Sequence, residues 1–479
     1  MENTEKDYQA ALETAHRESL KYITSLDAHA VGATADLHAL RARLRKPLSD
    51  EGLPAEQVVA ELARDADAGI IRQGGGRYFA WVNGGTLPAA MAADWLAAGW
   101  DQNAGMYATS PAAAVAEEVA GEWLKEILGL PQEASFALLT GCQMAHITCL
   151  AAARHALLRA KGWDVEERGL FGAPPIRVLT SEERHGTAER ALRILGMGKA
   201  CMRLLPANER ACLEPAVLER ALAGDRTTPT IVLLQAGDVN TGAYDSFEEL
   251  IPLARKHGAW VHVDGAFGLW AAASERFRHL VRGVEAADSW ATDGHKWLNV
   301  PYDCGYAFVR DREAHRNSMS HREPYLVHAS EARDALDWNP EWSRRARAFP
   351  TYAALRQLGR RGVAQMIESC CDQARALVAG IGALPGAEIV REAVINQGLV
   401  RFLDPRPGAT DADHDRKTDQ VIAAIDASGE AFFGGTTWRG RRAMRVSVCS
   451  YKTTAQDVER VISAFARILQ SELAAQPKA

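Results

Sequence analysis

Asp264 and Lys296 stand at the ends of two apolar runs, and their side chains can do chemistry together. Asp264 closes the run Trp260–Asp264, and Lys296 follows the run Ser289–Thr292. A lysine and a carboxylate are rarely buried unless they pair with each other or serve a function. A plain ion pair, or two solvated loop residues, is the alternative that the spacing alone leaves open. In an active site, a lysine amine forms an imine with an aldehyde, and a carboxylate keeps a pyridine nitrogen protonated.

Pyridoxal phosphate is the aldehyde cofactor that needs both of these groups, and two further features of the sequence fit it. Its phosphate is best held by backbone amides at the start of a helix. Gly141, Cys142 and Gln143 open a predicted helix that runs through Arg154. The cofactor ring needs a flat group over one face, and the imidazole of His185 is of that kind. The sequence therefore predicts a site for this cofactor.

Strand-like runs alternate with helical segments through the middle of the chain. The runs are Ile176–Thr180, Thr230–Gln235, Trp260–Asp264 and Ser289–Thr292. This alternation predicts an α/β fold, with a mainly parallel sheet and helices on both faces. Functional residues of such sheets gather beyond the carboxyl ends of the strands. Asp238 to Thr241, Asp264, and Asp293 to Lys296 all come at the ends of predicted strands, so we expect them at one edge of the sheet.

Helical segments precede this pattern, and a mixed region follows it. Residues 1 to about 70 predict a few helices with breaks at Pro47 and Gly52–Pro54, and Ser110-Pro111 predicts a helix with a serine cap. After about residue 350 two further strands are predicted, at Gly398–Leu403 and Ala443–Cys449. The predicted domains are an amino-terminal helical dimerisation segment (1–90), a large cofactor-binding domain (91–350) and a small carboxyl-terminal α+β domain (351–479).

Composition and charge disfavour several classes of protein. The 479 residues include 55 basic and 61 acidic side chains, a net charge of −6, and 47% are hydrophobic. That balance gives no bulk attraction to nucleic acid or to an anionic membrane, so a small-molecule substrate is favoured. No apolar run approaches the ~18 residues of a membrane span, and the first residues do not resemble a signal peptide.

Cysteine usage and glycine spacing narrow the choice further. The eight cysteines contain no CxxC pair and no metal-like spacing, so we expect reduced thiols, a cytoplasmic location and no metal site. No G-x-G-x-x-G motif follows the first strand, which disfavours a nicotinamide enzyme on a similar sheet.

Four segments together resemble the group II pyridoxal-phosphate-dependent amino acid decarboxylases. They are Glu183–His185, Asn240–Asp245, His262–Gly268 and Asp293–Gly305. That family includes the aromatic amino acid, histidine and glutamate decarboxylases on the fold-type-I scaffold of aspartate aminotransferase. The resemblance runs in the same order from about residue 75 to 465. It implies a mainly parallel sheet of the seven-stranded type, a homodimer with shared active sites, and decarboxylation of an L-amino acid.

The resemblance also implies roles for individual residues. Lys296 corresponds to the lysine that holds the cofactor, Asp264 to the partner of the ring nitrogen, and His185 to the residue stacked on the ring. Ala266 would touch the other ring face. The remaining implied cofactor-binding positions are Gly141, Cys142, Gln143, Thr241, Ser289, Asp293 and His295, with Gly435 and Thr436 in a stretch that either reaches the neighbouring subunit's cofactor or forms a simple turn. The expected substrate-binding positions are Trp81, Val82, Asn83 and Tyr107.

One residue of the family pattern is missing. The family carries a loop tyrosine that protonates the substrate carbon after carbon dioxide leaves, but Glu331–Trp342 contains none, and Ala335 stands at its position. Trp338 and Trp342 lie nearby, and an indole is a poor proton donor. We expect an aromatic or bulky amino acid to give its amine. The alternatives are oxygen-dependent formation of an aldehyde, aldol-type cleavage and transamination.

Three other expectations concern residues around this site. The stretch from about Ser330 to Trp342 is expected to be a mobile lid, which the cluster of Arg344, Arg345 and Arg347 braces. His146 is expected to pack on its helix rather than to take part in catalysis. A cofactor-free scaffold is the rival from a different class, and retention of the lysine, the aspartate and the ring-stacking histidine disfavours it.

Overall fold

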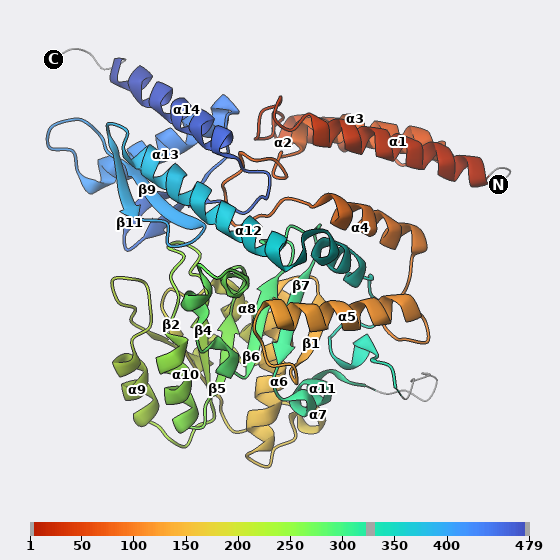
Figure 1. Cartoon of the computed structure of the whole chain (residues 1–479), viewed down its shortest axis with the longest axis vertical. Coiled ribbons are helices and arrows are strands. Elements are labelled where there is room, and N and C mark those ends of the chain that lie inside the picture. Colours follow the sequence, from red (N-terminus) through yellow and green to blue (C-terminus); the bar gives the residue numbers. More distant parts are fainter. Residues whose placement is uncertain (1–3, 322–330, 475–479) are drawn as a thin grey trace. The chain divides into compact units, whose positions relative to one another are not determined.

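The computed structural model describes residues 4–321 and 331–474, and their contacts divide into two compact units (Figure 1). Unit 1 comprises 1–81, 376–390 and 399–479, and unit 2 comprises 82–375 and 391–398. The amino-terminal segment therefore clusters with the carboxyl-terminal region rather than standing alone. The division into three functional domains, with boundaries at residues 90 and 350, stays a prediction.

Unit 2 contains the predicted α/β sheet. Its seven strands lie in the order β1-β7-β6-β5-β4-β2-β3. Their bounds are β1 Ser135–Leu139, β2 Arg177–Ser181, β3 Met202–Leu205, β4 Thr230–Gln235, β5 Trp260–Asp264, β6 Ser289–Asp293 and β7 Gly305–Val309. The pairs β2–β3, β2–β4, β4–β5 and β5–β6 are parallel, whereas β7 is antiparallel to β1 and β6. The mainly parallel seven-stranded sheet is confirmed.

The register of β7 defines two edges of this sheet. Gly305 pairs with both Leu139 and Asp293, the last residues of β1 and β6. Val309 pairs with both Ser135 and Ser289, the first residues of the same strands. We call the end of the sheet at Leu139 and Asp293 the carboxyl edge, and the end at Ser135 and Ser289 the amino edge.

The central strands form because they are apolar runs that can be buried on both faces. Every residue of β1, β4, β5, β6 and β7 is buried, as expected for strands covered by helices. Helix α6 (Cys142–Arg159) packs across β1, β5, β6 and β7. The other helices of unit 2 are α4 Pro88–Trp100, α5 Pro111–Ile127, α7 Val165–Arg168, α8 Gly186–Ile194, α9 Pro215–Ala223, α10 Phe247–Lys256 and α11 Arg312–Met319.

The predicted N-cap position of α5 is confirmed, but the predicted capping hydrogen bond of the serine is not formed. Ser110 stands at the N-cap, but its side chain makes no capping hydrogen bond. Its backbone has ψ 73°, away from the extended conformation usual at a cap. The start of the helix rests instead on Pro111, whose fixed φ suits the first turn and which has no amide hydrogen to satisfy.

Unit 1 combines the predicted amino-terminal helices with most of a small sheet. The helices are α1 Thr4–Thr24, α2 Leu37–Leu44, α3 Ala55–Ala66, α13 Asp411–Ser428 and α14 Ala455–Ala474. The sheet has the order β10-β11-β9-β8, with β8 Ala387–Arg391, β9 Gln397–Phe402, β10 Gly434–Trp438 and β11 Arg441–Ser447. Helix α12 (Ala348–Gly382) runs from unit 2 into unit 1.

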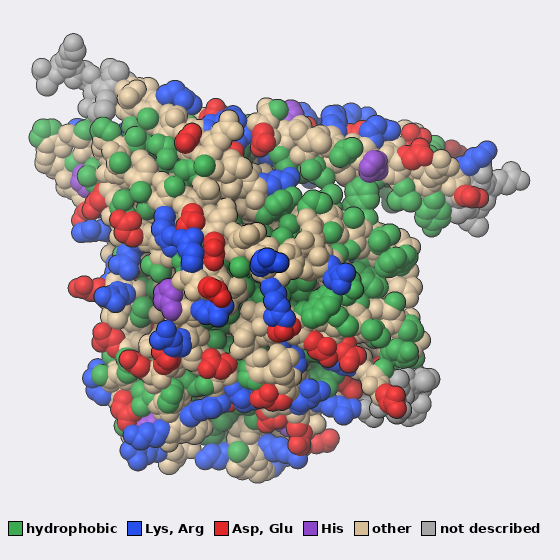
Figure 2. Space-filling model, viewed as in Figure 1, with side chains coloured by type: hydrophobic (Ala, Val, Ile, Leu, Met, Phe, Trp, Pro, Cys, Tyr) green, Lys and Arg blue, Asp and Glu red, His purple; other side chains and the backbone are tan. Residues whose placement is uncertain are grey.

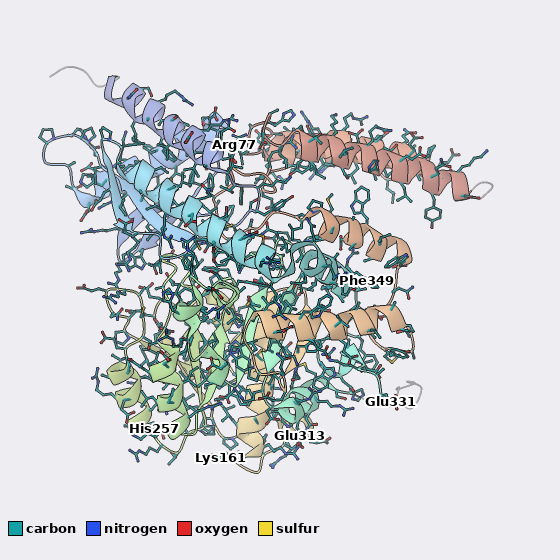
Figure 3. All side chains as sticks on the ribbon, in the orientation of Figure 1. Arg77, Lys161, His257, Glu313, Glu331 and Phe349 are labelled. Carbon is teal, nitrogen blue, oxygen red and sulfur yellow. The ribbon has the colours of Figure 1, made fainter. Side chains whose placement is uncertain are left out.

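Arg77, labelled in Figure 3, connects an amino-terminal segment of unit 1 to a carboxyl-terminal one. Its buried guanidinium donates hydrogen bonds to the carbonyl oxygens of Asp27, His29 and Glu430. These bonds satisfy polar backbone groups from segments far apart in the sequence. No helix within 4–321 and 331–474 is long and apolar enough to span a membrane.

Candidate active site

Lys296 lies just beyond the carboxyl edge and pairs with Asp293. Its Nζ is 2.9 Å from Oδ2 of Asp293, which is buried at the end of β6. Burial by itself lowers the pKa of the Lys296 amine, but the charge of Asp293 and its hydrogen bond outweigh burial and raise the pKa above its ordinary value. The amine is therefore a protonated, paired group, and it must lose a proton before it can act as a nucleophile.

Asp293 also holds the start of α6. Its Oδ1 accepts a hydrogen bond of 2.6 Å from the backbone amide of Cys142. Gly141 precedes it at φ +154°, and a Cβ there would lie 2.9 Å from Cε1 of His295. The structure thus brings together five predicted positions. However, the Cys142 amide, which was expected to face a phosphate, is already bonded to a carboxylate of the protein.

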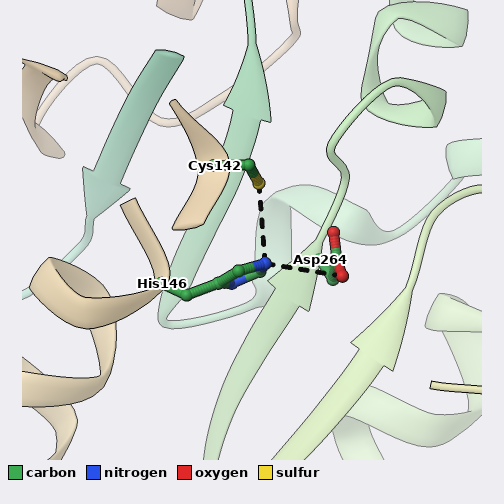
Figure 4. Close-up of side chains that lie close together, drawn as sticks. All are labelled: Cys142, His146 and Asp264. Atoms are coloured by element: carbon green, nitrogen blue, oxygen red, sulfur yellow. Dashed lines mark hydrogen bonds and ion pairs between the residues drawn. The ribbon is translucent and has the colours of Figure 1, made fainter. Parts of the chain in front are cut away.

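Asp264 ends β5 beside this group, in a buried setting. Its Oδ1 accepts a hydrogen bond of 3.1 Å from the amide of Ala266. Its Oδ2 lies 3.4 Å from Nε2 of His146, which reaches it from α6 (Figure 4). Burial raises the pKa of the Asp264 carboxyl, but His146, then His185 and Lys296, outweigh burial and hold it well below its usual range. Asp264 is therefore an ionised carboxylate.

His146 is a site residue that sequence reasoning missed. It was expected to pack within its helix, yet its ring contacts Asp264 and its Nδ1 lies 2.8 Å from Nε2 of His262. Two signals pointed this way. His146 lies one helical turn after Cys142, on the same face of α6. His262 lies two residues before Asp264, so both side chains leave the same face of β5.

Cys142, His146 and Asp264 also have ligand atoms that all lie within 4.8 Å of one another, close enough to hold a metal ion. Burial raises the pKa of the Cys142 thiol well above its ordinary value. The protonated thiol lies 3.5 Å from Nε2 of His146, which itself contacts Asp264. We therefore assign these three residues to the environment of Asp264.

Asn83 and Tyr302 form a second part of the site around His295. The Tyr302 ring stacks on the imidazole of His295 at 4.4 Å between centroids, and its hydroxyl donates to Oδ1 of Asn83 at 3.0 Å. The adjoining backbone lies so close that a Cβ on Gly84 would be 1.9 Å from the carbonyl oxygen of Lys296. Asn83 was predicted to bind substrate. Tyr302 was missed, although it lies inside the lysine motif.

His185 and Gln143 are linked through the first turn of α8. His185 is exposed at the N-cap, and its Nδ1 lies 2.8 Å from Oγ1 of Thr187. Gln143 donates from Nε2 to the carbonyl oxygen of Thr187 at 3.2 Å.

Ala266 lies between Asp264 and Asp293. Its amide donates to Asp264, and its carbonyl oxygen accepts a hydrogen bond of 2.9 Å from the amide of Asp293.

Two predicted cofactor contacts in unit 2 are occupied by other partners. The Thr241 hydroxyl is buried and donates to Oδ1 of Asp238 at 2.9 Å, within the loop after β4. Ser289 lies at the amino edge, at the opposite end of β6 from Asp293. Its hydroxyl lies 2.9 Å from both Nε1 of Trp260 and Nδ1 of His262. Ser289 therefore does not line the lysine site directly, because the strand separates the two ends.

Five other predicted positions lie in different surroundings. The backbone amide of Tyr107 donates to Oδ1 of Asp334 at 2.9 Å. Trp81 belongs to unit 1, where its ring packs 6.2 Å from that of Phe432, while Val82 begins unit 2 and is buried. Gly435 and Thr436 lie in strand β10, paired with β11. The stretch that holds them is therefore a strand rather than the loop or turn expected.

The predicted lid is not loose where the structure describes it. Trp338 is buried, and its carbonyl oxygen lies 2.7 Å from Nε2 of His315. Nδ1 of His315 is in turn 2.8 Å from the hydroxyl of Ser135. Because Ser135 lies at the amino edge, Trp338 lies at the end of the sheet opposite Lys296. Residues 322–330 lie outside the described part of the chain.

The arginine cluster anchors this segment rather than bracing a moving lid. Arg344 is fully buried and pairs with Glu117 of α5, with 2.5 Å between Nη1 and Oε2. Arg345 pairs with Asp94 at 2.7 Å. Arg347 pairs with both Asp303 and Glu341 at 2.9 Å. Each arginine thus forms an ion pair with an acidic residue of the same chain, which argues against a binding site for a polyanion.

Comparisons with known proteins agree on a single family. The model of the pyridoxal-dependent decarboxylase conserved domain matches residues 38–403. An aromatic-L-amino-acid decarboxylase of Bacillus atrophaeus is 25% identical over 92% of this chain and 91% of its own length. A phenylacetaldehyde synthase of a Rosa hybrid cultivar is 25% identical over 86% of this chain and 83% of its own length.

A solved structure shares the architecture. The crystal structure of Oryza sativa TDC with PLP and tryptamine superposes with a TM-score of 0.91, 25% identity and full coverage of both chains. The family match covers most of the chain, and the lysine and aspartate of the predicted motifs meet at the carboxyl edge of the expected sheet. The chain therefore belongs to the pyridoxal-dependent decarboxylase family and is a pyridoxal-phosphate-dependent amino acid decarboxylase.

Proposed function

We propose that this enzyme decarboxylates an aromatic L-amino acid to its amine, with Lys296, Asp264 and His185 as the catalytic residues. The observation that carries the proposal is that an amine and a buried, ionised carboxylate lie at the same edge of the sheet. Lys296 supplies the amine, with Nζ 2.9 Å from Asp293, and Asp264 supplies the carboxylate. The aromatic substrate class rests on the relatives, which include aromatic-L-amino-acid and tryptophan decarboxylases.

The residues present fit pyridoxal phosphate. Lys296 would hold the cofactor through its amine, Asp264 would face the ring nitrogen, and His185 and Ala266 would face the ring. When bound, the cofactor withdraws electrons from a bond of the substrate that lies perpendicular to its ring. The protein keeps Asp264 ionised and holds a proton on Lys296 beside Asp293, where the amine could return that proton to the substrate.

The exposed ring of Tyr302 supports an aromatic amino acid as the substrate. Tyr302 is half exposed, and its ring orientation is set by the stack on His295 and the bond to Asn83. A fixed, accessible ring favours a substrate with an aromatic side chain. We assign Asn83 and Tyr302 to substrate binding, and we keep Trp81, Val82 and Tyr107 as proposed contributors.

Formation of an aldehyde is the second candidate. It is favoured by the relative named phenylacetaldehyde synthase. Tyr325, which stands between the lysine motif and Glu331, lies outside the described residues. In that reaction, amino acid, O₂ and water give aldehyde, CO₂, ammonia and H₂O₂, so oxygen is the oxidant. The same site also leaves aldol-type cleavage and transamination as minor alternatives.

The assembly and location form a further part of the proposal. We propose a homodimer with shared active sites, because apolar side chains of α1 such as Tyr8 and Leu12 are exposed. A cytoplasmic location is supported by the cysteines, since all eight are free thiols.

Borohydride reduction followed by peptide mapping tests the lysine assignment. The pyridoxyl label should be found on Lys296, and Lys296→Ala should lose both the label and turnover. A label on any other lysine would overturn the assignment. In parallel, aromatic and other bulky amino acids should be supplied to the wild type while CO₂, amine, aldehyde and peroxide are followed. Amine from an aromatic substrate supports the first function, and stoichiometric aldehyde and peroxide would support the second.

A further inference from the structure

A continuous chain of buried polar side chains runs behind Asp264, on the face of the sheet that α6 covers. His146 Nε2 lies 3.4 Å from Asp264 Oδ2, and His146 Nδ1 lies 2.8 Å from His262 Nε2. His262 Nδ1 lies 2.9 Å from the hydroxyl of Ser289, which also accepts from Nε1 of Trp260 at 2.9 Å. The side chains come from α6, β5 and β6. We call these residues, from Trp260 to Asp264 through Ser289, His262 and His146, the histidine chain.

The donors and acceptors of this chain fix where the proton of His146 must lie. Ionised Asp264 can only accept, so a bare Nε2 on His146 would face a carboxylate lone pair and repel it. If His262 donates from Nε2, then Nδ1 of His146 accepts and the proton of His146 is on Nε2. If His262 accepts instead, His146 must carry both protons to keep a hydrogen bond to Asp264, because a bare Nε2 could accept only from the Cys142 thiol 3.5 Å away and would face the carboxylate without a proton. Both arrangements place an N–H on the side of Asp264.

His262 is held neutral in either arrangement. Burial, together with the neighbouring His146, lowers the pKa of His262 to about 3. It therefore cannot compete with the substrate or the cofactor for a proton in the ordinary working range. The neutral His262 imidazole, whose Nδ1 lies beside the Ser289 hydroxyl, can therefore fix the orientation of the His146 ring without adding a charge.

The remaining charged groups around Asp264 come from other elements. Asp293 ends β6 and Lys296 follows it, His185 lies at the start of α8, and the neutral Cys142 thiol lies 3.5 Å from Nε2 of His146. Lys296 and His185 are part of the expected machinery and are partly accessible. His146 is fully buried, so it cannot meet the substrate.

We propose that His146 is a positioning residue, which the histidine chain orients so that its Nε2–H holds Asp264 ionised and aimed at the ring nitrogen of bound pyridoxal phosphate. The inference rests on the role proposed above for Asp264. It deepens that role by naming what fixes the carboxylate. A histidine that only filled space would need neither a polar partner at each nitrogen nor the Ser289 hydroxyl behind it.

The first test needs no catalysis. The full-length protein labelled with ¹⁵N-histidine should show His146 protonated at Nε2, with and without pyridoxal phosphate, and His262 should stay neutral from pH 5 to 9. Ser289→Ala should alter the His146 and His262 signals, although Ser289 lies at the far edge of the sheet. A neutral His146 protonated only at Nδ1 would overturn the proposal.

The second test measures the ring nitrogen directly, with ¹⁵N-labelled pyridoxal phosphate bound to each variant. His146→Leu should reduce ring protonation at neutral pH, shift the pH profile of the cofactor absorbance, and lower kcat by about 10- to 100-fold, the usual range when an orienting partner is removed. His146→Gln keeps an N–H near Nε2 and should recover most of each effect. His155→Leu is the matched control, because His155 is also buried on α6 and lies 3.4 Å from the carboxylate of Glu166.

Asp264→Asn separates this inference from the proposed function. If Asp264→Asn reduces ring protonation but His146→Leu does not, then the positioning role is wrong and the role of Asp264 stands. If neither variant changes the ring nitrogen, the role of Asp264 itself is wrong. If His146→Leu fails to fold, His146→Gln and the Ser289→Ala spectra still decide. A loss of the effects after removal of metal ions with a chelator would indicate a cation at Cys142, His146 and Asp264, and would also overturn the proposal.

Discussion

Asp293 connects the two halves of the site through the two oxygens of one carboxylate. One oxygen accepts from the amide of Cys142 at 2.6 Å, and the other lies 2.9 Å from the amine of Lys296. The first contact complements the positive end of the α6 dipole. The second keeps the lysine protonated. Asp293 therefore both holds the start of α6 and keeps Lys296 protonated. A neutral side chain at this position could do only the first.

Asp293→Asn should make Lys296 easier to deprotonate. An amide oxygen still accepts from Cys142, but the negative charge that raises the pKa of Lys296 is gone. The free amine is the nucleophile, so attachment of pyridoxal phosphate to the apo-protein should reach its full rate at lower pH. Stopped-flow absorbance across pH 6 to 10 measures this. Asp303→Asn, which removes a partner of Arg347 instead, should leave the profile unchanged.

Asp264→Asn should keep the cofactor and lose most activity. An amide cannot stabilise a protonated ring nitrogen, so the electron-withdrawing power of the cofactor should fall and kcat should drop by several orders of magnitude. Cofactor content by absorbance and turnover by CO₂ release measure the two properties separately. Near-normal turnover in a folded variant would show that Asp264 is structural.

At the scale of elements, a buried ion cluster fixes the segment that was expected to be a lid. Glu117 of α5 accepts from Nη1 of Arg333 at 3.1 Å and pairs with the buried Arg344. Arg344 also donates to the carbonyl oxygen of Leu138 in β1 at 2.5 Å. These bonds tie residues on both sides of Trp338 to α5 and β1, so the segment is fixed against unit 2.

Glu117→Gln should destabilise the protein by about 3–5 kcal/mol, because it leaves two buried guanidinium groups without their shared anion. Urea unfolding followed by tryptophan fluorescence measures the change in the free energy of unfolding. Glu118→Gln is the matched control, since Glu118 is its exposed neighbour on the same helix. Equal stability of the two variants would show that the cluster contributes nothing to the fold.

At the scale of the whole molecule, apolar side chains remain exposed on both units. In unit 1 they include Tyr8, Leu12 and Leu20 on α1. In unit 2 they include Trp95, Leu96 and Trp100 on α4, and Figure 2 shows apolar side chains gathered over this helix. Trp100 meets Phe349 edge to face at 5.1 Å (Phe349 is labelled in Figure 3). Exposed apolar groups of this size mark a surface that binds another protein.

Sedimentation should therefore show a dimer at working concentration. The double variant Leu12→Glu/Leu20→Glu should sediment as a monomer and lose activity, because two charges would be buried in an interface that commonly exceeds ~2,000 Å². Ile194→Glu, a change at an exposed apolar residue of α8, should remain dimeric. An active monomeric wild type would contradict the proposed assembly.

The sequence alone determined four of the seven strands of the large sheet and the group of residues at its carboxyl edge. Four predicted strands match β2, β4, β5 and β6 to within one residue at each end. Strands buried on both faces are continuous apolar runs, and polar residues follow where such a strand leaves the core. Parallel strands end at the same edge, so Asp264, Asp293 and Lys296 could be placed together from their positions in the chain.

Only the tertiary structure decided which side chains lie behind and around that group. The contact between His146 and His262 joins residues 116 apart, and that between Asn83 and Tyr302 joins residues 219 apart. Ser289 was expected to contact the cofactor and the segment at Trp338 to form a lid, but both lie at the amino edge, because motif order along a chain does not state which end of a strand a residue occupies. These contacts depend on how α6 crosses the sheet and on strand register, which are set by packing between elements rather than by the local pattern within them.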